Sequence, residues 1–149
     1  MREIKKQLFA FCASYIEQKI IAAQRAMEKA QNEANQETKS SAGDKHETGR
    51  SMMQLEKQKY ALHLQQALRL KKSFAMINKD ESYELVEKGA VVETDNGNFF
   101  VAIAAGRVKL EKEYVCISLA SPLGLALESA EEGDIVVFRD KEIEIFSIF

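Results

Sequence analysis

Two carboxylates, Asp44 and Glu47, lie three residues apart in the segment 42–50, which reads Ala-Gly-Asp-Lys-His-Glu-Thr-Gly-Arg. Long stretches with helical periodicity flank this segment, and its serines and glycines are typical of a chain reversal. Side chains at positions i and i+3 near the start of a helix can point the same way. The pattern therefore predicts two acids displayed together at the end of a helical hairpin, where they could act on something outside the chain.

The same residues also have simpler roles open to them. Asp and Glu near a helix N-terminus often cap the backbone and interact with the helix dipole, and Asp44 with Glu47 fits a capping box. The spacing alone favours this capping role. Lys45 and Arg50 could contact RNA or phosphates, or belong to the solvated face of the helix. His46 is expected to be a solvated loop residue.

The flanking segments predict two antiparallel helices, at about 3–38 and 48–77. Apolar residues recur at alternating steps of three and four, which places them in one stripe along each helix. Met52 and Met53 are expected to pack where the hairpin narrows. In the first segment the stripe is Phe9, Cys12, Ile16, Ile20, Ala23, Met27, Ala30 and Ala34; in the second it is Tyr60, Leu64, Ala67, Lys71 and Phe74, with Met53 and Leu55 nearer the bend.

Charge divides the chain into two parts. Residues 1–78 contain 14 Lys and Arg against 8 Asp and Glu, whereas residues 79–149 contain 7 against 15. Helical periodicity also stops near residue 78. We therefore predict an N-terminal hairpin domain, 1–78, and a separate globular domain, 79–149.

The second part has the pattern of strands. Residues 90–94 and 98–103 flank Asn96-Gly97, a strong signal for a two-residue β-turn. A second β-hairpin is expected at 107–118, and a third at 135–148 with its turn at Asp140-Lys141. Ser121 as N-cap and Pro122 at the first helical position predict a short helix at 121–129. The fold class is therefore α+β, a small antiparallel sheet with one short helix following the helical hairpin.

Several functional classes are disfavoured. The apolar run at 99–105 is too short to span a bilayer, and the N-terminal residues lack the apolar core of a signal peptide, so we expect a cytoplasmic protein without a membrane partner. Cys12 and Cys116 are expected to be reduced core residues. The sequence has no phosphate-binding glycine loop, no nucleophile with a base and no metal cluster, so an independent enzyme is not predicted.

Two segments now indicate a family. Residues 43–47 are similar to the Gly-Asp-Leu-x-Glu stretch of the Gre family of bacterial transcript-cleavage factors, and Glu56-Lys57-Gln58 is similar to its following Glu-x-Gln. Ser121-Pro122-Leu123-Gly124, with Gly133-Asp134 behind it, resembles the family's Ser-Pro-Leu-Gly and Gly-Asp. The resemblance covers about nine-tenths of the chain. It implies a coiled-coil hairpin followed by a domain of FKBP-like fold.

The resemblance also implies a function. Gre factors bind RNA polymerase, insert the coiled coil into its secondary channel and stimulate hydrolysis of the 3′ end of backtracked RNA. By this likeness Asp44 and Glu47 would help to hold a second Mg²⁺ in the polymerase complex, and no cofactor would be bound by the free protein, which we expect to be a monomer. Lys45 and Arg50 would contact RNA, and Ser121, Pro122, Leu123 and Gly124 would bind polymerase.

Two other functions stay open. After Glu47 the chain has Thr48-Gly49-Arg50-Ser51 in place of the family's Asn-Ala-Glu-Tyr. An acid and an aromatic residue are absent there, which allows a secondary-channel regulator that binds polymerase without stimulating cleavage. The helical pattern also allows a coiled-coil adaptor with no polymerase contact, although the Ser-Pro-Leu-Gly segment makes this interpretation weaker.

Overall fold

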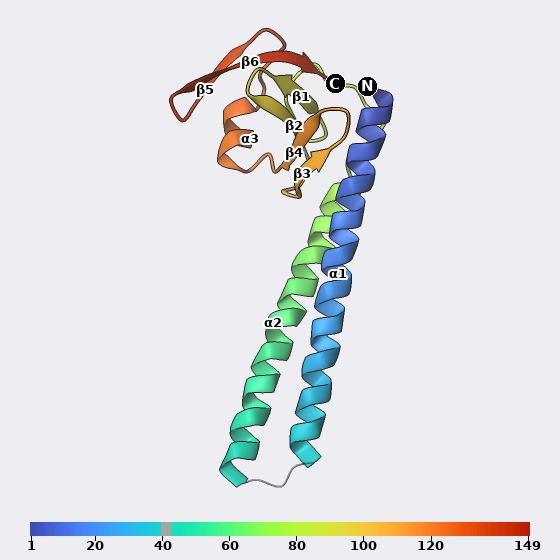
Figure 1. Cartoon of the computed structure of the whole chain (residues 1–149), viewed down its shortest axis with the longest axis vertical. Helices are drawn as coiled ribbons and strands as arrows, with labels where there is room; N and C mark the ends of the chain where they lie inside the picture. The colour runs from blue at the N-terminus through green and yellow to red at the C-terminus, as the bar shows by residue number, and fades with distance from the viewer. Residues whose placement is uncertain (40–42) are drawn as a thin grey trace. The chain divides into compact units, whose positions relative to one another are not determined.

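The computed structural model describes the backbone of residues 1–39 and 43–149, and the side chains of residues 1–36 and 48–149. Two long helices precede a sheet of six strands, and one short helix lies between the fourth and fifth strands in the sequence (Figure 1). No helix in the described ranges is both long and apolar enough to cross a membrane. In order, the elements are α1 (Arg2–Lys39), α2 (Gly43–Ala75), β1 (Val91–Thr94), β2 (Gly97–Val101), β3 (Gly106–Lys109), β4 (Glu113–Ile117), α3 (Pro122–Leu127), β5 (Ile135–Phe138) and β6 (Lys141–Ile148).

The chain forms two compact units, which differ from the two halves distinguished by charge. One unit combines Met1–Tyr15 with Ser73–Phe149, and the other is Ile16–Lys72. The first turns of α1 therefore pack with the sheet, although they belong to the helical hairpin in sequence. The domain boundary at 78/79 stays a prediction.

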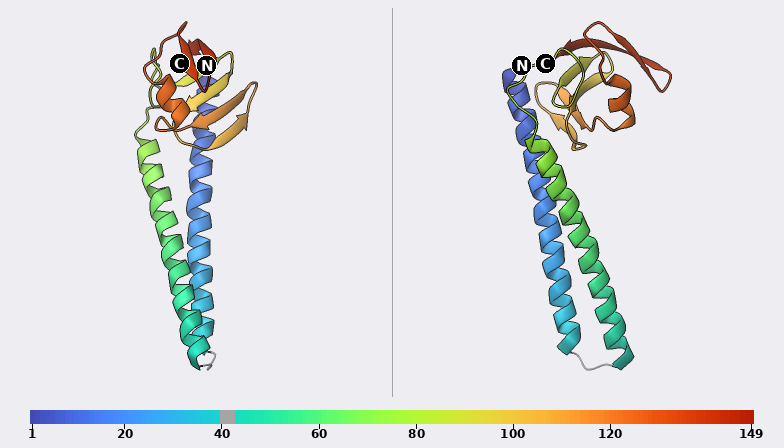
Figure 2. Two further views of the ribbon diagram at one scale, coloured as in Figure 1. Left: turned by 90° about the vertical axis from the view of Figure 1, so that its left-hand side faces the viewer. Right: turned by 180° about the vertical axis from the view of Figure 1, so that it is seen from behind.

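The unit Ile16–Lys72 is an antiparallel helical hairpin, with α1 and α2 side by side (Figure 2). The predicted stripe on α1 is confirmed by the burial of Ile16, Ile20, Ala23 and Ala30, and Ala67 is buried on α2. Of the two methionines expected to pack where the hairpin narrows, Met53 is half-buried, whereas Met52 is exposed and its expected packing is wrong.

The sheet contains all three expected β-hairpins but is mixed rather than wholly antiparallel. Its strand order is β3-β4-β2-β1-β6-β5. The β3–β4 hairpin is placed with β3 at the outer edge, so β4 lies beside β2 and runs parallel to it, pairing Phe100 with Cys116. Local turn signals identify each hairpin, whereas the way that hairpins join depends on long-range pairing.

The first β-turn lies one residue earlier than expected. Thr94 pairs with Gly97, so Asp95 and Asn96 form the turn, and Gly97 takes the positive φ of +122°. The Thr94 hydroxyl explains this register. It donates to the Gly97 carbonyl at 2.6 Å and accepts from the Asn96 amide at 3.0 Å, which closes the turn from its first residue.

The third β-hairpin shows the same difference. Phe138 pairs with Lys141, so the turn residues are Arg139 and Asp140 rather than Asp140 and Lys141. Both have positive φ, at 50° and 64°, as a two-residue turn of type I′ requires. The right-handed twist of the paired strands favours this turn even without the usual Asn-Gly sequence.

Different elements cover the two faces of the sheet. On one face Leu123 and Leu127 of α3 pack against a core that includes Val92, Phe99 and Ile145. On the other face Phe9 of α1 lies with its ring centroid 5.2 Å from that of Phe100. Cys12 and Cys116, one from α1 and one from β4, are buried beside this contact and free of disulfides, as expected.

Candidate functional site

The predicted acidic pair lies partly outside the described structure. The side chains of Asp44, Lys45, His46 and Glu47 are not among the described residues, so the metal and RNA roles of these positions stay predictions. Their backbone is helical, because α2 begins at Gly43. The helix thus begins five residues before its predicted start, and Asp44 is its second residue. The capping-box alternative depends on side chains outside the described residues and stays a prediction.

Arg50 is the member of the predicted RNA-contacting pair that the structure describes. It lies on α2 and its side chain is exposed. On α1, Arg25 and Lys29 are also exposed. Basic side chains on the described part of the hairpin are therefore available to an anionic partner, and their exposure is equally consistent with a solvated helix face.

Other polar side chains of the hairpin serve its own packing. Lys57 donates to the Oε1 atom of Gln31 at 2.5 Å, which links α2 to α1. Lys71 and Glu17 form an exposed ion pair with a separation of 3.5 Å. His63 is exposed and lies edge-on to Tyr60, with 5.8 Å between ring centroids, so it belongs to the surface of the helix.

The second predicted site is the segment from Ser121 to Gly124, which forms the start of α3. Ser121 has extended backbone angles, and its hydroxyl accepts from the Gly124 amide at 3.0 Å while donating to the Ser118 carbonyl at 2.6 Å. Pro122 follows at the first helical position, where it needs no amide proton. The N-cap and proline roles predicted from the sequence are confirmed.

Gly124 is required by close packing. A Cβ atom at this position would lie 2.3 Å from the Ser118 carbonyl oxygen and 2.7 Å from that of Leu119. Leu123 is half-buried against the core. All four residues predicted to bind polymerase thus have a structural role in the domain, and among them only Pro122 is fully exposed.

Leu125 was not among the predicted site residues, although it is the exposed apolar side chain of this helix. Gly124 and Leu127 of α3 are buried, which leaves Leu125 on the solvent-facing side of the helix. Leu125 lies three positions after the exposed Pro122, so the two side chains are neighbours on that side. Helical periodicity could have identified it. Pro122 and Leu125 therefore form the accessible apolar part of this segment.

The described side chains do not form a metal site by themselves. No group of three or more His, Cys, Asp or Glu side chains is suitably placed for a metal ion among residues 1–36 and 48–149. Asp44 and Glu47 lie outside these ranges, so a site that they share with another protein is not tested.

Several solved structures are similar to this chain. No family model matches the chain, and no curated protein matches it. One similar structure is the GreA factor homolog 1 (Gfh1) of Thermus thermophilus, with 19% identity, a TM-score of 0.38 and coverage of 90% of this chain and 92% of that one. A second structure, of the transcription factor Gfh1, has 19% identity, a TM-score of 0.38 and coverage of 89% and 90%.

Proposed function

We propose that this protein is a Gre-like transcription factor that binds RNA polymerase and stimulates cleavage of backtracked RNA. The observation that carries the proposal is the position of Asp44 and Glu47 among the first five residues of α2, the helix that follows α1 in the antiparallel hairpin. Acids placed there could enter a channel ahead of the rest of the hairpin. The fold of the Ser121–Gly124 segment, which resembles the family motif, supports the same interpretation.

The chain's own contribution would be to supply ligands rather than to perform the reaction. Asp44 and Glu47 would offer carboxylate oxygens to a Mg²⁺ ion shared with the polymerase, an ion that stabilises the attacking and leaving oxygens of the RNA phosphate. The globular unit would anchor the protein on the polymerase, where Pro122 is accessible for contact. Arg50 would lie near RNA phosphates.

The test is RNA release from a stalled, backtracked elongation complex assembled with polymerase from the same source. Asp44→Asn and Glu47→Gln should each lower cleavage by about 10²-fold, the scale seen when one preorganised charge stabiliser is removed. Polymerase affinity should stay unchanged, and added Mg²⁺ should partly restore cleavage. The matched control is Glu28→Gln, which changes an exposed acid on α1. This variant should stimulate cleavage as strongly as the wild type does.

Two results would contradict this proposal. If the variants stimulate cleavage as well as the wild type does and their free energy of unfolding falls by about 1 kcal/mol, the acids act as helix caps. If the wild type binds polymerase but releases no RNA at any Mg²⁺ concentration, the protein is a non-cleaving regulator of the secondary channel. The second candidate is favoured by one observation, the exposed cation Arg50 in a segment where the family has an acidic residue.

A further inference from the structure

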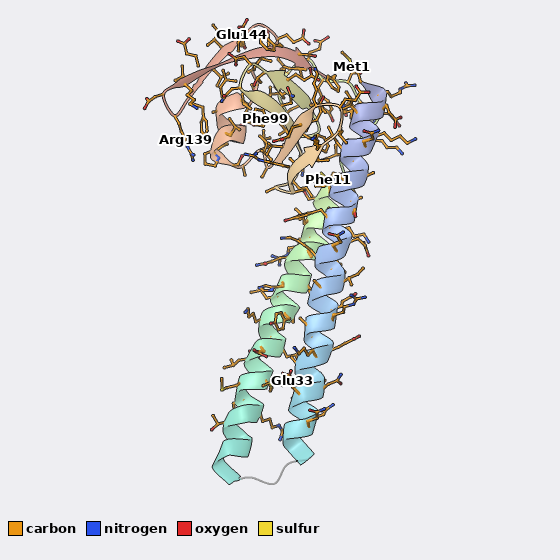
Figure 3. The ribbon with its side chains drawn as sticks, viewed as in Figure 1. Met1, Phe11, Glu33, Phe99, Arg139 and Glu144 are labelled. Carbon is orange, nitrogen blue, oxygen red and sulfur yellow. The ribbon has the colours of Figure 1, made fainter. Side chains whose placement is uncertain are left out.

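The β5–β6 hairpin has an unusual outer face. Ile135 and Val137 of β5 are 62% and 65% exposed, and Phe146 of β6 is 57% exposed. Strand register pairs Ile135 with Glu144 and Val137 with Glu142, and paired residues share a face. Ile135, Val137, Glu142 and Glu144 therefore share one face. The exposed Phe146 extends it, because it lies two positions beyond Glu144 on β6 and the intervening Ile145 is buried. We call these five residues the ribbon face. Figure 3 shows Glu144 on the outer side of this hairpin.

The apolar side chains of the ribbon face are not part of the core. The opposite face of the hairpin contributes the core residues, because Ile143 and Ile145 are each 1% exposed and Val136 packs against the buried cluster. A strand with one face in the core normally turns polar side chains outward. In this hairpin three large apolar side chains face solvent on or next to β5, the last strand of the sheet. Such a patch marks a surface that meets a partner.

Charge identifies the kind of partner. Two of the five side chains of the ribbon face are carboxylates, and residues 79–149 have 15 acidic against 7 basic residues. Nucleic acid and anionic lipid would both be repelled. Two copies of the chain docked through this face would place four glutamates and no basic residue of the ribbon face in one interface. A protein surface with apolar side chains surrounded by Lys and Arg is complementary to the ribbon face both in its apolar character and in its charge.

We propose that the ribbon face docks on such a surface of RNA polymerase. The inference rests on the proposed function, and it adds a contact distinct from the Ser121–Gly124 segment. Val136 points from β5 toward the core that α3 covers, so the ribbon face lies on the side of β5 turned away from α3. Ile135, Val137 and Phe146 would form the desolvated centre of the contact, and the two glutamates its charged rim.

The test uses the full chain and core RNA polymerase from the same source, with the dissociation constant measured at low and high salt. Ile135→Thr and Val137→Thr keep a β-branched side chain and remove apolar surface, so folding should be preserved. Each should raise the dissociation constant by at least about fivefold, the effect of losing a central apolar contact. Glu142→Lys with Glu144→Lys should slow association and abolish most of the salt dependence. Met76→Thr, at an 82% exposed apolar position in the same unit, is the matched control and should bind normally.

The outcomes separate this inference from the proposed function. If the wild type does not bind polymerase, both are overturned. If the wild type binds and the ribbon variants bind equally well, the docking inference is overturned while the function stands. Loss of binding in Leu125→Ser alone would place the contact on α3 instead. Circular dichroism and thermal unfolding of each variant must match the wild type, and the charge reversals, which remove no buried group, test the same surface if a threonine variant is unstable.

Discussion

A methyl group at position 124 would collide with the backbone that precedes α3. The Ser118 carbonyl oxygen would lie 2.3 Å from it, and a backbone oxygen cannot move aside as a flexible side chain can. Gly124→Ala should therefore lower the free energy of unfolding by about 2 kcal/mol or more. Leu125→Ala, an exposed change in the same helix, should lower it by less than about 0.5 kcal/mol. Urea unfolding of both variants measures the difference, and equal stabilities would show that the turn at 118–121 can shift.

Both carboxylate oxygens of Glu93, on β1, accept hydrogen bonds. Its Oε2 atom accepts from Lys112 Nζ at 2.9 Å, and its Oε1 atom accepts from the hydroxyl of the buried Tyr114 at 2.9 Å. Partial burial acts to raise the pKa of Glu93, but these hydrogen bonds and the charge of Lys112 outweigh it, and the net effect lowers the pKa. Burial and the bond to Glu93 raise the pKa of Tyr114, which therefore stays a donor.

This site predicts a loss of stability in acid. Because the pKa of Glu93 is lowered in the folded state, its contribution is present above the ordinary value of 4.5 and is lost as pH falls through the folded value. Wild type should therefore lose its stability advantage over Glu93→Gln below about pH 4.5. Thermal unfolding of both proteins across pH 3 to 7 checks this. Glu113→Gln, which removes an exposed ion pair with Arg107, should follow the wild type.

At the scale of elements, the β5–β6 turn is held in a conformation that its residues do not favour. Arg139 and Asp140 both have positive φ, which costs residues other than glycine about 1–2 kcal/mol. Arg139 is partly compensated, since its guanidinium lies 5.0 Å from the centre of the Phe138 ring. Asp140 is therefore the better place to relieve the strain.

Asp140→Gly should raise the free energy of unfolding by about 0.5–1 kcal/mol. Glycine removes the steric cost of positive φ, and this gain exceeds the loss that comes from the greater entropy of the unfolded chain. Asp134→Gly is the matched comparison, an Asp-to-Gly change a few residues earlier. It should destabilise the protein, since the Asp134 Oδ2 atom accepts from the Glu131 amide at 2.8 Å. Chemical denaturation compares the two, and a loss of stability in Asp140→Gly would mean that Asp140 makes a stabilising contact of its own.

At the scale of the whole molecule, the sheet depends on the first turns of α1. Phe9 covers Phe100, and the buried Lys5 donates to the Glu81 carbonyl at 2.5 Å with its ammonium group 4.4 Å from the centre of the Tyr83 ring. Leu8 is fully buried as well. A fragment of residues 79–149 would lose these contacts and expose one face of its sheet.

We therefore expect the 79–149 fragment to unfold at least 10 °C below the intact chain or to aggregate. A variant that keeps Met1–Tyr15 and Ser73–Phe149 but shortens both helices by the same number of turns should keep its melting temperature within a few degrees. Differential scanning calorimetry of the two decides where the domain boundary lies. A fragment of 79–149 as stable as the intact chain would support the boundary inferred from charge and would show that the sheet does not need the first turns of α1.

Local signals in the sequence were sufficient to locate the helices and the β-hairpins. Apolar steps of three and four residues located both long helices and the buried Ile16, Ile20 and Ala23, because a helix brings such positions onto one face. Ser121 and Pro122 located the start of α3, since capping involves only neighbouring residues. Alternating apolar residues and turn residues located three β-hairpins. The candidate acids, too, could be proposed from their place between two helical patterns.

Tertiary structure decided what depends on residues far apart in the chain. The parallel pairing of β2 with β4 and the burial of α1 against Phe100 join segments that carry no local sign of each other. Gly124 proved to be a packing requirement, because its constraint comes from the carbonyls of Ser118 and Leu119 rather than from its own turn. The ribbon face appeared only when register placed Ile135 and Val137 beside Glu144 and Glu142, and when burial showed that these positions and Phe146 face away from the core. Periodicity shows which residues share a face, but only the packed fold shows whether that face is covered.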